Sequence, residues 1–143
     1  MNHINGQQLR DIYASTHTIA VVGASADPAK IAHQIPRYLH DQGYRIFPVN
    51  PRGGELFGQA VRASLAGIPD QIDVVDVFRP PAESVSVARQ AIATGARVLW
   101  FQPGTETAEA VRIATDAGLT VVTGWCMGSI HAQLGLGPAP GRT

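Results

Sequence analysis

Five positions in the chain place small, polar or ring residues directly after a run of apolar side chains. They are Gly23-Ala24-Ser25, Asn50-Pro51, Phe78-Arg79-Pro80, Gln102-Pro103-Gly104 and Gly124-Trp125-Cys126. The first is the strongest candidate for chemistry, because small residues let the backbone approach a diphosphate and Ser25 adds a hydroxyl. Backbone amides at the start of the following helix supply positive potential for the same anion. The structural alternative is a tight turn without a ligand.

Two residues near this loop bear on the kind of phosphate compound it would hold. Lys30 stands at the start of the next expected helix, where a cation opposes the helix dipole, so an anionic ligand would explain its presence. Asn50 stands where dinucleotide-binding domains usually carry a carboxylate for the ribose 2′-hydroxyl. Its uncharged amide does not repel a phosphorylated ribose. A solvated lysine and a plain Asn-Pro turn are the structural alternatives.

Other groupings of reactive residues are weaker candidates. Arg79 precedes two prolines and is expected either to cap an adenine ring or to pair with Asp76. Cys126 and His131 fall on different faces of a short helix and lack an orienting carboxylate, which argues against a catalytic dyad. The histidines, at positions 3, 17, 33, 40 and 131, lack the spacing of metal ligands. The loop at Gly23 has one glycine where the nicotinamide-binding pattern G-x-G-x-x-G needs three.

Buried strands must bring these positions together, and the sequence contains five runs of strand composition. They are expected at Ile19–Val22, Tyr44–Val49, Val74–Phe78, Val98–Phe101 and Leu119–Val122. Each run is almost continuously apolar, which is typical of strands that are covered on both faces of a parallel sheet. The carboxyl ends of such strands meet at one edge, where ligands bind near the topological switch point.

Segments with helical spacing lie between these runs. The first places Ile31 and Leu39 on one face, and Pro36 inside it predicts either a kink or the beginning of the regular helix. Two later segments end at Gly95 and Gly118, residues suited to helix C-termini. The alternation predicts an α/β fold, a Rossmann-like doubly wound domain whose mostly parallel five-stranded sheet is flanked by helices.

Composition narrows the class of protein. A length of 143 residues predicts one domain, with a core at about 5–135 and a loose, Gly- and Pro-rich tail at 136–143. Eleven basic and eleven acidic side chains cancel, which gives no electrostatic case for nucleic acid or an anionic membrane as a partner. Cys126 is the only cysteine, and the polar N-terminus lacks an apolar signal core, so a cytoplasmic location is expected.

Six motifs, in this order along the chain, resemble one family. They are VVGASADPAK, GYRIFPVNP, SLAGIP, DVVDVFRP, GARVLWFQPG and AGLTVV, the last followed by Cys126. The sequence is similar to the stand-alone CoA-binding domain proteins, relatives of the CoA-binding half of the succinyl-CoA synthetase α-subunit. The resemblance covers about residues 5–135 and implies a Rossmann-like fold that binds coenzyme A at its strand ends.

The resemblance also implies which residues surround the ligand. Gly23, Ala24 and Ser25 would hold the diphosphate, with Lys30 beside an ADP phosphate. Asn50 and Pro51 would flank the nucleotide. Val77, Phe78 and Arg79 would line the adenine or pantetheine side, and Gln102, Cys126 and Met127 would lie near the pocket. The chain departs from the family at Ile130, where members commonly carry a glutamate before the histidine, and at Pro36, where they more often have a helix former.

These observations lead to one main hypothesis and three alternatives. The chain has no G-x-x-x-x-G-K motif for ATP, so we expect a small-molecule-binding protein that holds CoA or an acyl-CoA without catalysis of its own. The first alternative is the CoA-binding component of a split acyl-CoA ligase, which requires an unidentified protein partner. The second is an NAD(H)-binding module. The third is a mixed disulfide between Cys126 and CoA, which would make binding redox-dependent.

Overall fold

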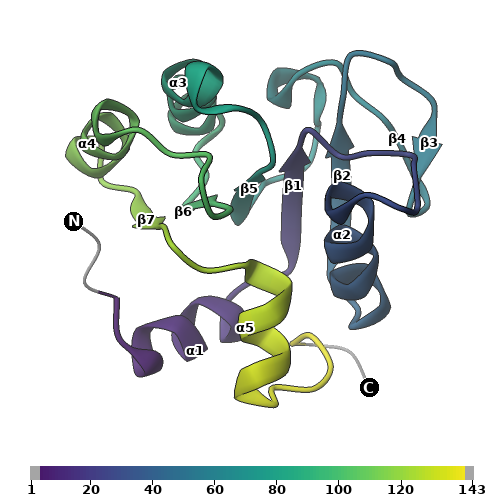
Figure 1. The fold of residues 1–143 in the computed structure, drawn as a ribbon, viewed down its shortest axis with the longest axis horizontal. Helices are drawn as coiled ribbons and strands as arrows, with labels where there is room; N and C mark the ends of the chain where they lie inside the picture. Colours follow the sequence, from purple (N-terminus) through teal and green to yellow (C-terminus); the bar gives the residue numbers. More distant parts are fainter. Residues whose placement is uncertain (1–3, 141–143) are drawn as a thin grey trace.

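The computed structural model describes residues 4–140 and contains an open sheet of five parallel strands with helices on both faces (Figure 1). The strands are β1 (Thr18–Val22), β2 (Arg45–Val49), β5 (Val74–Val77), β6 (Val98–Phe101) and β7 (Thr120–Val122). All five predicted strands are confirmed, with ends that differ by at most one residue. The predicted Rossmann-like α/β architecture is therefore confirmed.

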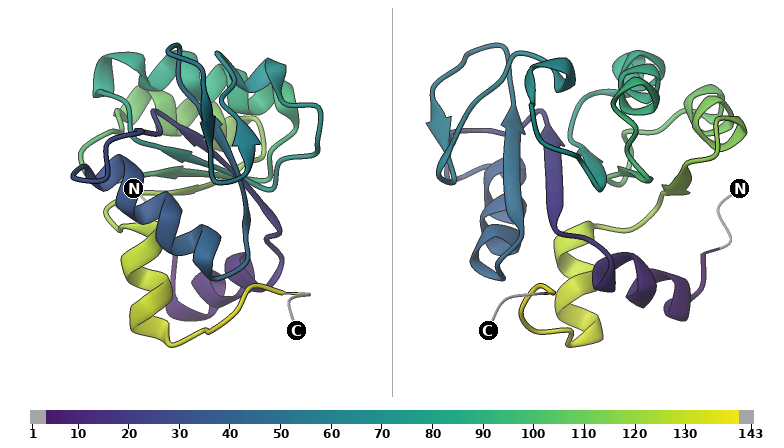
Figure 2. Two further views of the ribbon diagram at one scale, coloured as in Figure 1. Left: turned by 90° about the vertical axis from the view of Figure 1, so that its right-hand side faces the viewer. Right: turned by 180° about the vertical axis from the view of Figure 1, so that it is seen from behind.

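Alternating side chains of the strands divide the core into two clusters. Helices α3 (Ser84–Thr94) and α4 (Ala108–Asp116) cover one face of the sheet. Helices α1 (Gly6–Ala14), α2 (Ile31–Asp41) and α5 (Met127–Leu134) cover the other face, as Figure 2 shows from two sides. Strand β1 is buried along its whole length, as its continuous apolar sequence predicts.

The order of strands in the sheet is β2-β1-β5-β6-β7. The chain therefore leaves β1 through α2 toward one edge, and then returns to place β5 on the other side of β1. Connections from these two central strands pass to opposite faces of the sheet, which opens a crevice beyond their carboxyl ends. This is the position at which a ligand site is expected.

Helix α2 runs through Pro36 without interruption and begins at Ile31, so the regular helix does not start at the proline. A proline has no N–H group, and the carbonyl of Ala32, four residues earlier, therefore lacks its usual helical donor. The Ser25 amide donates to that carbonyl at 3.1 Å. Pro36 thus allows the loop after β1 to be bonded directly to the first turn of α2.

Several smaller elements were not anticipated from the sequence. They are α1, the two-stranded sheet of β3 (Glu55–Leu56) and β4 (Gln59–Ala60), and the 3-10 turns η1 (Leu65–Gly67) and η2 (Pro81–Glu83). The expected loose tail also needs correction for residues 136–140. Ala139 is buried, and its amide donates to the Gln42 carbonyl at 2.7 Å. Residues 141–143 lie outside the described part of the chain.

Candidate functional site

The loop after β1 begins at a position that requires glycine. Gly23 has φ +92°, and a Cβ atom at this position would lie 2.7 Å from Cδ of Arg79. Its amide donates to the Val49 carbonyl at 2.9 Å, which fixes the loop against β2. Glycine therefore lets the strand end turn sharply while the Arg79 side chain lies across it.

The amides of this loop are only partly used by the protein itself. Ser25 donates to the Ala32 carbonyl, and Asp27 donates to Ser25 Oγ at 3.0 Å. The amides of Ala24 and Ala26 have no hydrogen-bond partner among the described residues. Because Ser25 Oγ accepts in its bond with Asp27, its own proton is still available for donation. Ala24 is fully buried, so the donors that the loop presents at its surface are the Ala26 amide and the Ser25 hydroxyl, groups that bind a phosphate.

A pocket of about 150 Å³ lies against this loop. It is lined by Ser25, Ala26, Asp27, Lys30, Asn50, Arg52, Gly53, Leu56 and Val61. Lys30 and Arg52 are the two cations of the lining, and neither forms an ion pair with another described residue. Lys30 is also the N-cap of α2 and makes no side-chain capping bond, so the start of this helix is uncapped. The pocket therefore combines two free cations with a helix N-terminus.

Arg52 was missed by the sequence analysis. It follows the Asn50-Pro51 turn directly, and a cation next to a strand-end turn was an available signal. Asn50 holds this turn in place: its Nδ2 donates to the Ala24 carbonyl at 2.7 Å, and its Oδ1 accepts from the Arg52 amide at 2.9 Å. Both ends of the Asn50 amide are thus occupied, and its observed role is to tie the β1 and β2 loops together.

Arg79 pairs with Glu83 and not with Asp76. Its Nη2 lies 2.7 Å and its Nε 3.1 Å from the Glu83 carboxylate, one turn further along the chain. Hydrogen bonding to Arg79 lowers the pKa of the Glu83 carboxyl. The expected Asp76–Arg79 pair is therefore wrong, because the two side chains leave β5 and its extension on opposite faces of the sheet. The Arg79 side chain is 43% exposed at the carboxyl edge of the sheet.

Val77 and Phe78, which precede Arg79, differ in how accessible their side chains are at the carboxyl edge of the sheet. Val77 is fully buried in the core beneath α3, so its side chain does not face the crevice. Its carbonyl accepts from the Gln102 amide at 3.2 Å and so helps to order the end of β6. Phe78 is partly buried and packs against the α1, α2 and α5 cluster. Of the residues expected on this side, Phe78 and Arg79 have accessible side chains.

Gln102, Cys126 and Met127, which were expected in the rest of the pocket, lie around the start of α5. Gln102 is almost fully buried, and its Oε1 accepts from the Met127 amide at 3.1 Å. Met127 is itself fully buried. Gln102 therefore caps α5 from the end of β6, and Cys126, the N-cap of α5, is the partly exposed member of this group.

The Cys126 thiol sits among hydrogen-bond donors. Burial alone would raise the pKa of this thiol, but hydrogen bonds from Ser129, Gln102 and the Gly128 amide lower it below its usual value. The start of a helix also favours a negative charge on sulfur. Cys126 consequently has the environment of a thiol that ionises readily.

His131 is 1% exposed and belongs to an aromatic cluster behind the site. Its Nδ1 lies 2.7 Å from the Tyr38 hydroxyl, and its ring makes edge contacts with Tyr13 and Tyr44. Burial lowers the pKa of His131. The histidine thus bonds to Tyr38 and packs as a core residue, separate from Cys126. In the described chain, no group of three His, Cys, Asp or Glu side chains is arranged to hold a metal ion.

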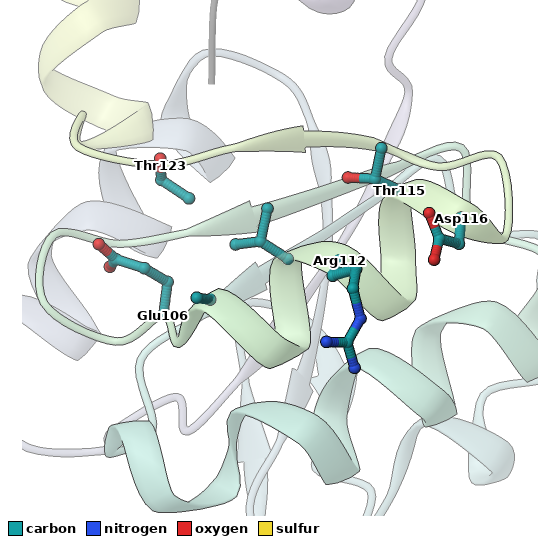
Figure 3. Close-up of a pocket in the computed structure, with 7 residues that line it drawn as sticks. Glu106, Arg112, Thr115, Asp116 and Thr123 are labelled. Atoms are coloured by element: carbon teal, nitrogen blue, oxygen red, sulfur yellow. The ribbon is translucent and has the colours of Figure 1, made fainter. Parts of the chain in front are cut away.

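A larger groove of about 530 Å³ runs along α4 and the edge strand β7 (Figure 3). It is lined by Glu106, Ala108, Val111, Arg112, Thr115, Asp116 and Thr123. None of the site residues expected from the sequence lies in it. Its two carboxylates outnumber its single cation, so its charge does not favour a phosphate compound.

Among the residues described, no helix is long and apolar enough to cross a bilayer.

The comparison with known families agrees with this geometry. The sequence matches the CoA binding domain over residues 17–132, which include every candidate site residue. The chain belongs to the CoA-binding domain family. The resemblance stated from the six motifs is therefore confirmed.

Members and relatives of this family cover the chain to different extents. The Bacillus subtilis protein YneT is 34% identical over 92% of this chain and 98% of its own length. A solved Thermus thermophilus structure, cell-free ID.343, superposes with a TM-score of 0.88 at 41% identity and covers 92% of this chain and 99% of its own. The α subunit of ADP-forming acetate–CoA ligase I from Pyrococcus furiosus is 39% identical over 69 residues. That match covers 44% of this chain and 15% of the ligase subunit.

Proposed function

We propose that this protein binds coenzyme A or an acyl-CoA at the carboxyl edge of β1, β2 and β5, without ATP-dependent chemistry of its own. The observation that carries the proposal is the pocket at the β1 loop. There, the unpartnered amide of Ala26 and the Ser25 hydroxyl adjoin two cations, Lys30 and Arg52, that have no ion-pair partner among the described residues. Membership of the CoA-binding domain family supports the same ligand.

The size of the pocket indicates which part of the ligand it holds. At about 150 Å³ it is too small for a whole CoA molecule, but it suits phosphate groups. The nucleotide phosphates would occupy the pocket, with the β1 loop donating to the diphosphate. The pantetheine arm would then lie along the open edge, past Arg79 and Gln102 toward Cys126.

The cations and the uncharged Asn50 explain a preference for CoA over a plain dinucleotide. CoA carries a phosphate on its ribose in addition to the diphosphate, and each cation can neutralise one of these groups. A carboxylate in place of Asn50 would repel that additional phosphate. Ligands without the ribose phosphate are therefore expected to bind less well.

Isothermal titration calorimetry of the purified protein with CoA, 3′-dephospho-CoA, ADP and NAD tests the proposal. We expect CoA to bind most tightly. Lys30→Ala and Arg52→Ala should each weaken CoA binding roughly tenfold, about 1.4 kcal/mol, as expected for one charge-assisted contact. Arg37→Ala is the matched control, because Arg37 is an exposed cation further along the same helix, pairs with Asp41 and lies outside the pocket.

Three results would contradict the proposal. Tighter binding of NAD than of CoA would favour a nicotinamide-binding module. Equal binding of CoA and dephospho-CoA would remove the role of the ribose phosphate. An equal loss of affinity in the Arg37→Ala control would show that the effect is one of overall charge and not of this pocket.

A second candidate function is the CoA-binding component of an acyl-CoA ligase whose ATP-handling part is a separate chain. The similarity to the Pyrococcus furiosus ligase subunit favours it, although this chain spans only 15% of that protein. Affinity purification in the presence of CoA should then recover an ATP-dependent partner, and acyl-CoA should form only when both chains are present. His131 is an unsuitable phosphoryl acceptor in this scheme, since it is buried and bonded to Tyr38.

A further inference from the structure

A buried carboxyl group lies in the centre of the sheet, outside the pocket described above. Asp76 has no accessible surface, and neither of its carboxylate oxygens has a side-chain hydrogen-bond partner among the described residues. The backbone amide of Val77 lies near enough to lower the pKa of the carboxyl in part. In the sheet register Asp76 lies between Val21 of β1 and Trp100 of β6. Both of these neighbours belong to the cluster beneath α1, α2 and α5, so strand alternation directs the Asp76 side chain toward that layer.

The segment that carries Cys126 is fastened over this same position. Trp100, the register partner of Asp76, donates from Nε1 to the Trp125 carbonyl at 2.8 Å. The Tyr13 hydroxyl donates to the Met127 carbonyl at 2.6 Å. The carbonyls of both neighbours of Cys126, Trp125 and Met127, are therefore held by side chains from the layer into which Asp76 points.

The charges of the two groups are coupled. Burial raises the pKa of the Asp76 carboxyl well above its ordinary value, and the nearby Cys126 thiolate raises it further. Hydrogen bonds around Cys126 act in the opposite direction on the thiol. Burial thus favours the neutral form of the Asp76 carboxyl, and it lies beneath a thiol whose pKa is lowered.

Other titratable groups packed around this layer do not carry charge near neutral pH. Burial raises the pKa of Tyr13, on α1, and of Tyr38, on α2, so both phenols stay neutral. Burial lowers the pKa of His131, on α5, so its imidazole is neutral as well. Asp76 and Cys126 are the pair whose ionisation changes the reactivity of the sulfur.

We propose that Cys126 is a nucleophilic thiol that exchanges with the disulfide of a pantetheine-type ligand, and that Asp76 is a positioning residue for this reaction. The ligand class rests on the proposed function, since the CoA arm ends in a thiol at this edge. In the reaction the Cys126 thiolate attacks one sulfur of the ligand disulfide. The ligand S–S bond breaks, a bond from Cys126 Sγ to that sulfur forms, and the other ligand half leaves as a thiolate that takes a proton from solvent.

Intact-mass measurement of mixed-disulfide formation tests this inference. The protein is mixed with CoA disulfide or with glutathione disulfide between pH 5 and pH 9, and the adduct is followed over time. The same chain unfolded in denaturant is the reference, because it carries the same thiol without its folded surroundings. We expect the folded protein to react at least roughly tenfold faster than the unfolded chain at pH 6, and faster with CoA disulfide than with glutathione disulfide.

Two variants separate positioning from mere structure. Asp76→Asn should shift the pH at which the rate rises, since the carboxyl that is coupled to the thiol is gone. Ser129→Ala removes one hydrogen-bond donor to the thiol and should slow the reaction at pH 6. Because Ser129 is on the surface side of α5, this second variant keeps the test decisive if Asp76→Asn does not fold.

The outcomes distinguish this inference from the proposed function. A folded protein that reacts no faster than the unfolded chain overturns the reactive thiol, even where calorimetry shows CoA binding. Equal rates with the two disulfides overturn the pantetheine preference. Faster reaction with CoA disulfide than with glutathione disulfide, together with no binding of free CoA in calorimetry, would reject the proposed function while supporting the exchange. A pH profile unchanged in Asp76→Asn overturns the role of the carboxyl.

Discussion

Asp76 is a carboxyl group placed where burial favours its neutral form. Transfer of an ionised carboxylate to such a site is costly, so the group retains its proton. The pKa of Asp76 is accordingly raised by burial first and by the Cys126 thiolate second. In the unfolded chain the same carboxyl ionises at its ordinary value of 3.8.

Because the pKa of Asp76 is higher in the folded protein than in the unfolded chain, the free energy of unfolding depends on pH. Above the ordinary pKa, unfolding releases the Asp76 proton, so the free energy of unfolding falls by about 1.4 kcal/mol per pH unit until the folded-state pKa is reached. We expect Asp76→Asn to remove this slope. Urea unfolding of Cys126→Ser and of Cys126→Ser with Asp76→Asn, at pH 5, 6 and 7, measures it without thiol titration. Parallel pH curves for the two proteins would refute the prediction.

The contrast between Asp76 and Arg79 shows which pairings a strand permits. The two residues are three positions apart, and an odd separation in an extended chain places side chains on opposite faces. Strand alternation could therefore have excluded their pairing from the sequence. Glu83, four residues after Arg79, is at the spacing at which a helical turn brings side chains together, and it is the observed partner.

At the level of elements, the sheet was predictable because its strands are continuous apolar runs. Helix α1 was missed although its start has a capping box, in which the Asn5 side chain accepts from the Gln8 amide at 2.8 Å and the Gln8 side chain accepts from the Asn5 amide. Strands β3 and β4 have two residues each, too few for any periodicity, so the sequence pattern could not predict them.

Pro36 couples α2 to the loop after β1. Replacing it with alanine restores an N–H group that competes with the Ser25 amide for the Ala32 carbonyl. We expect the Pro36→Ala helix to be more stable and the loop to be looser, with faster hydrogen exchange of the Ser25 amide by NMR and weaker CoA binding. Unchanged exchange at Ser25 would show that the loop does not depend on this bond. Gly95, at the end of α3 and away from the loop, supplies an amide whose exchange should not change.

Across the whole molecule, the site is a product of topology. Residues from four segments that are distant in sequence meet at one edge because parallel strands share their carboxyl ends. The edge, and the loops at Gly23, Asn50, Arg79 and Gln102, followed from the sequence. The unpartnered Ala26 amide did not, because it depends on which hydrogen bonds the folded chain leaves unused. Arg52 could have been found from its place directly after the Asn50-Pro51 turn.

An NMR titration with CoA, followed on the backbone amides, tests the central claim most directly. We expect the largest chemical-shift changes at Ser25 and Ala26, with further changes at Arg52 and at the start of α5. The groove along α4, around Glu106 and Arg112, should be unaffected. Changes concentrated in that groove, or none at all at saturating CoA, would contradict a CoA site at the carboxyl edge of the sheet.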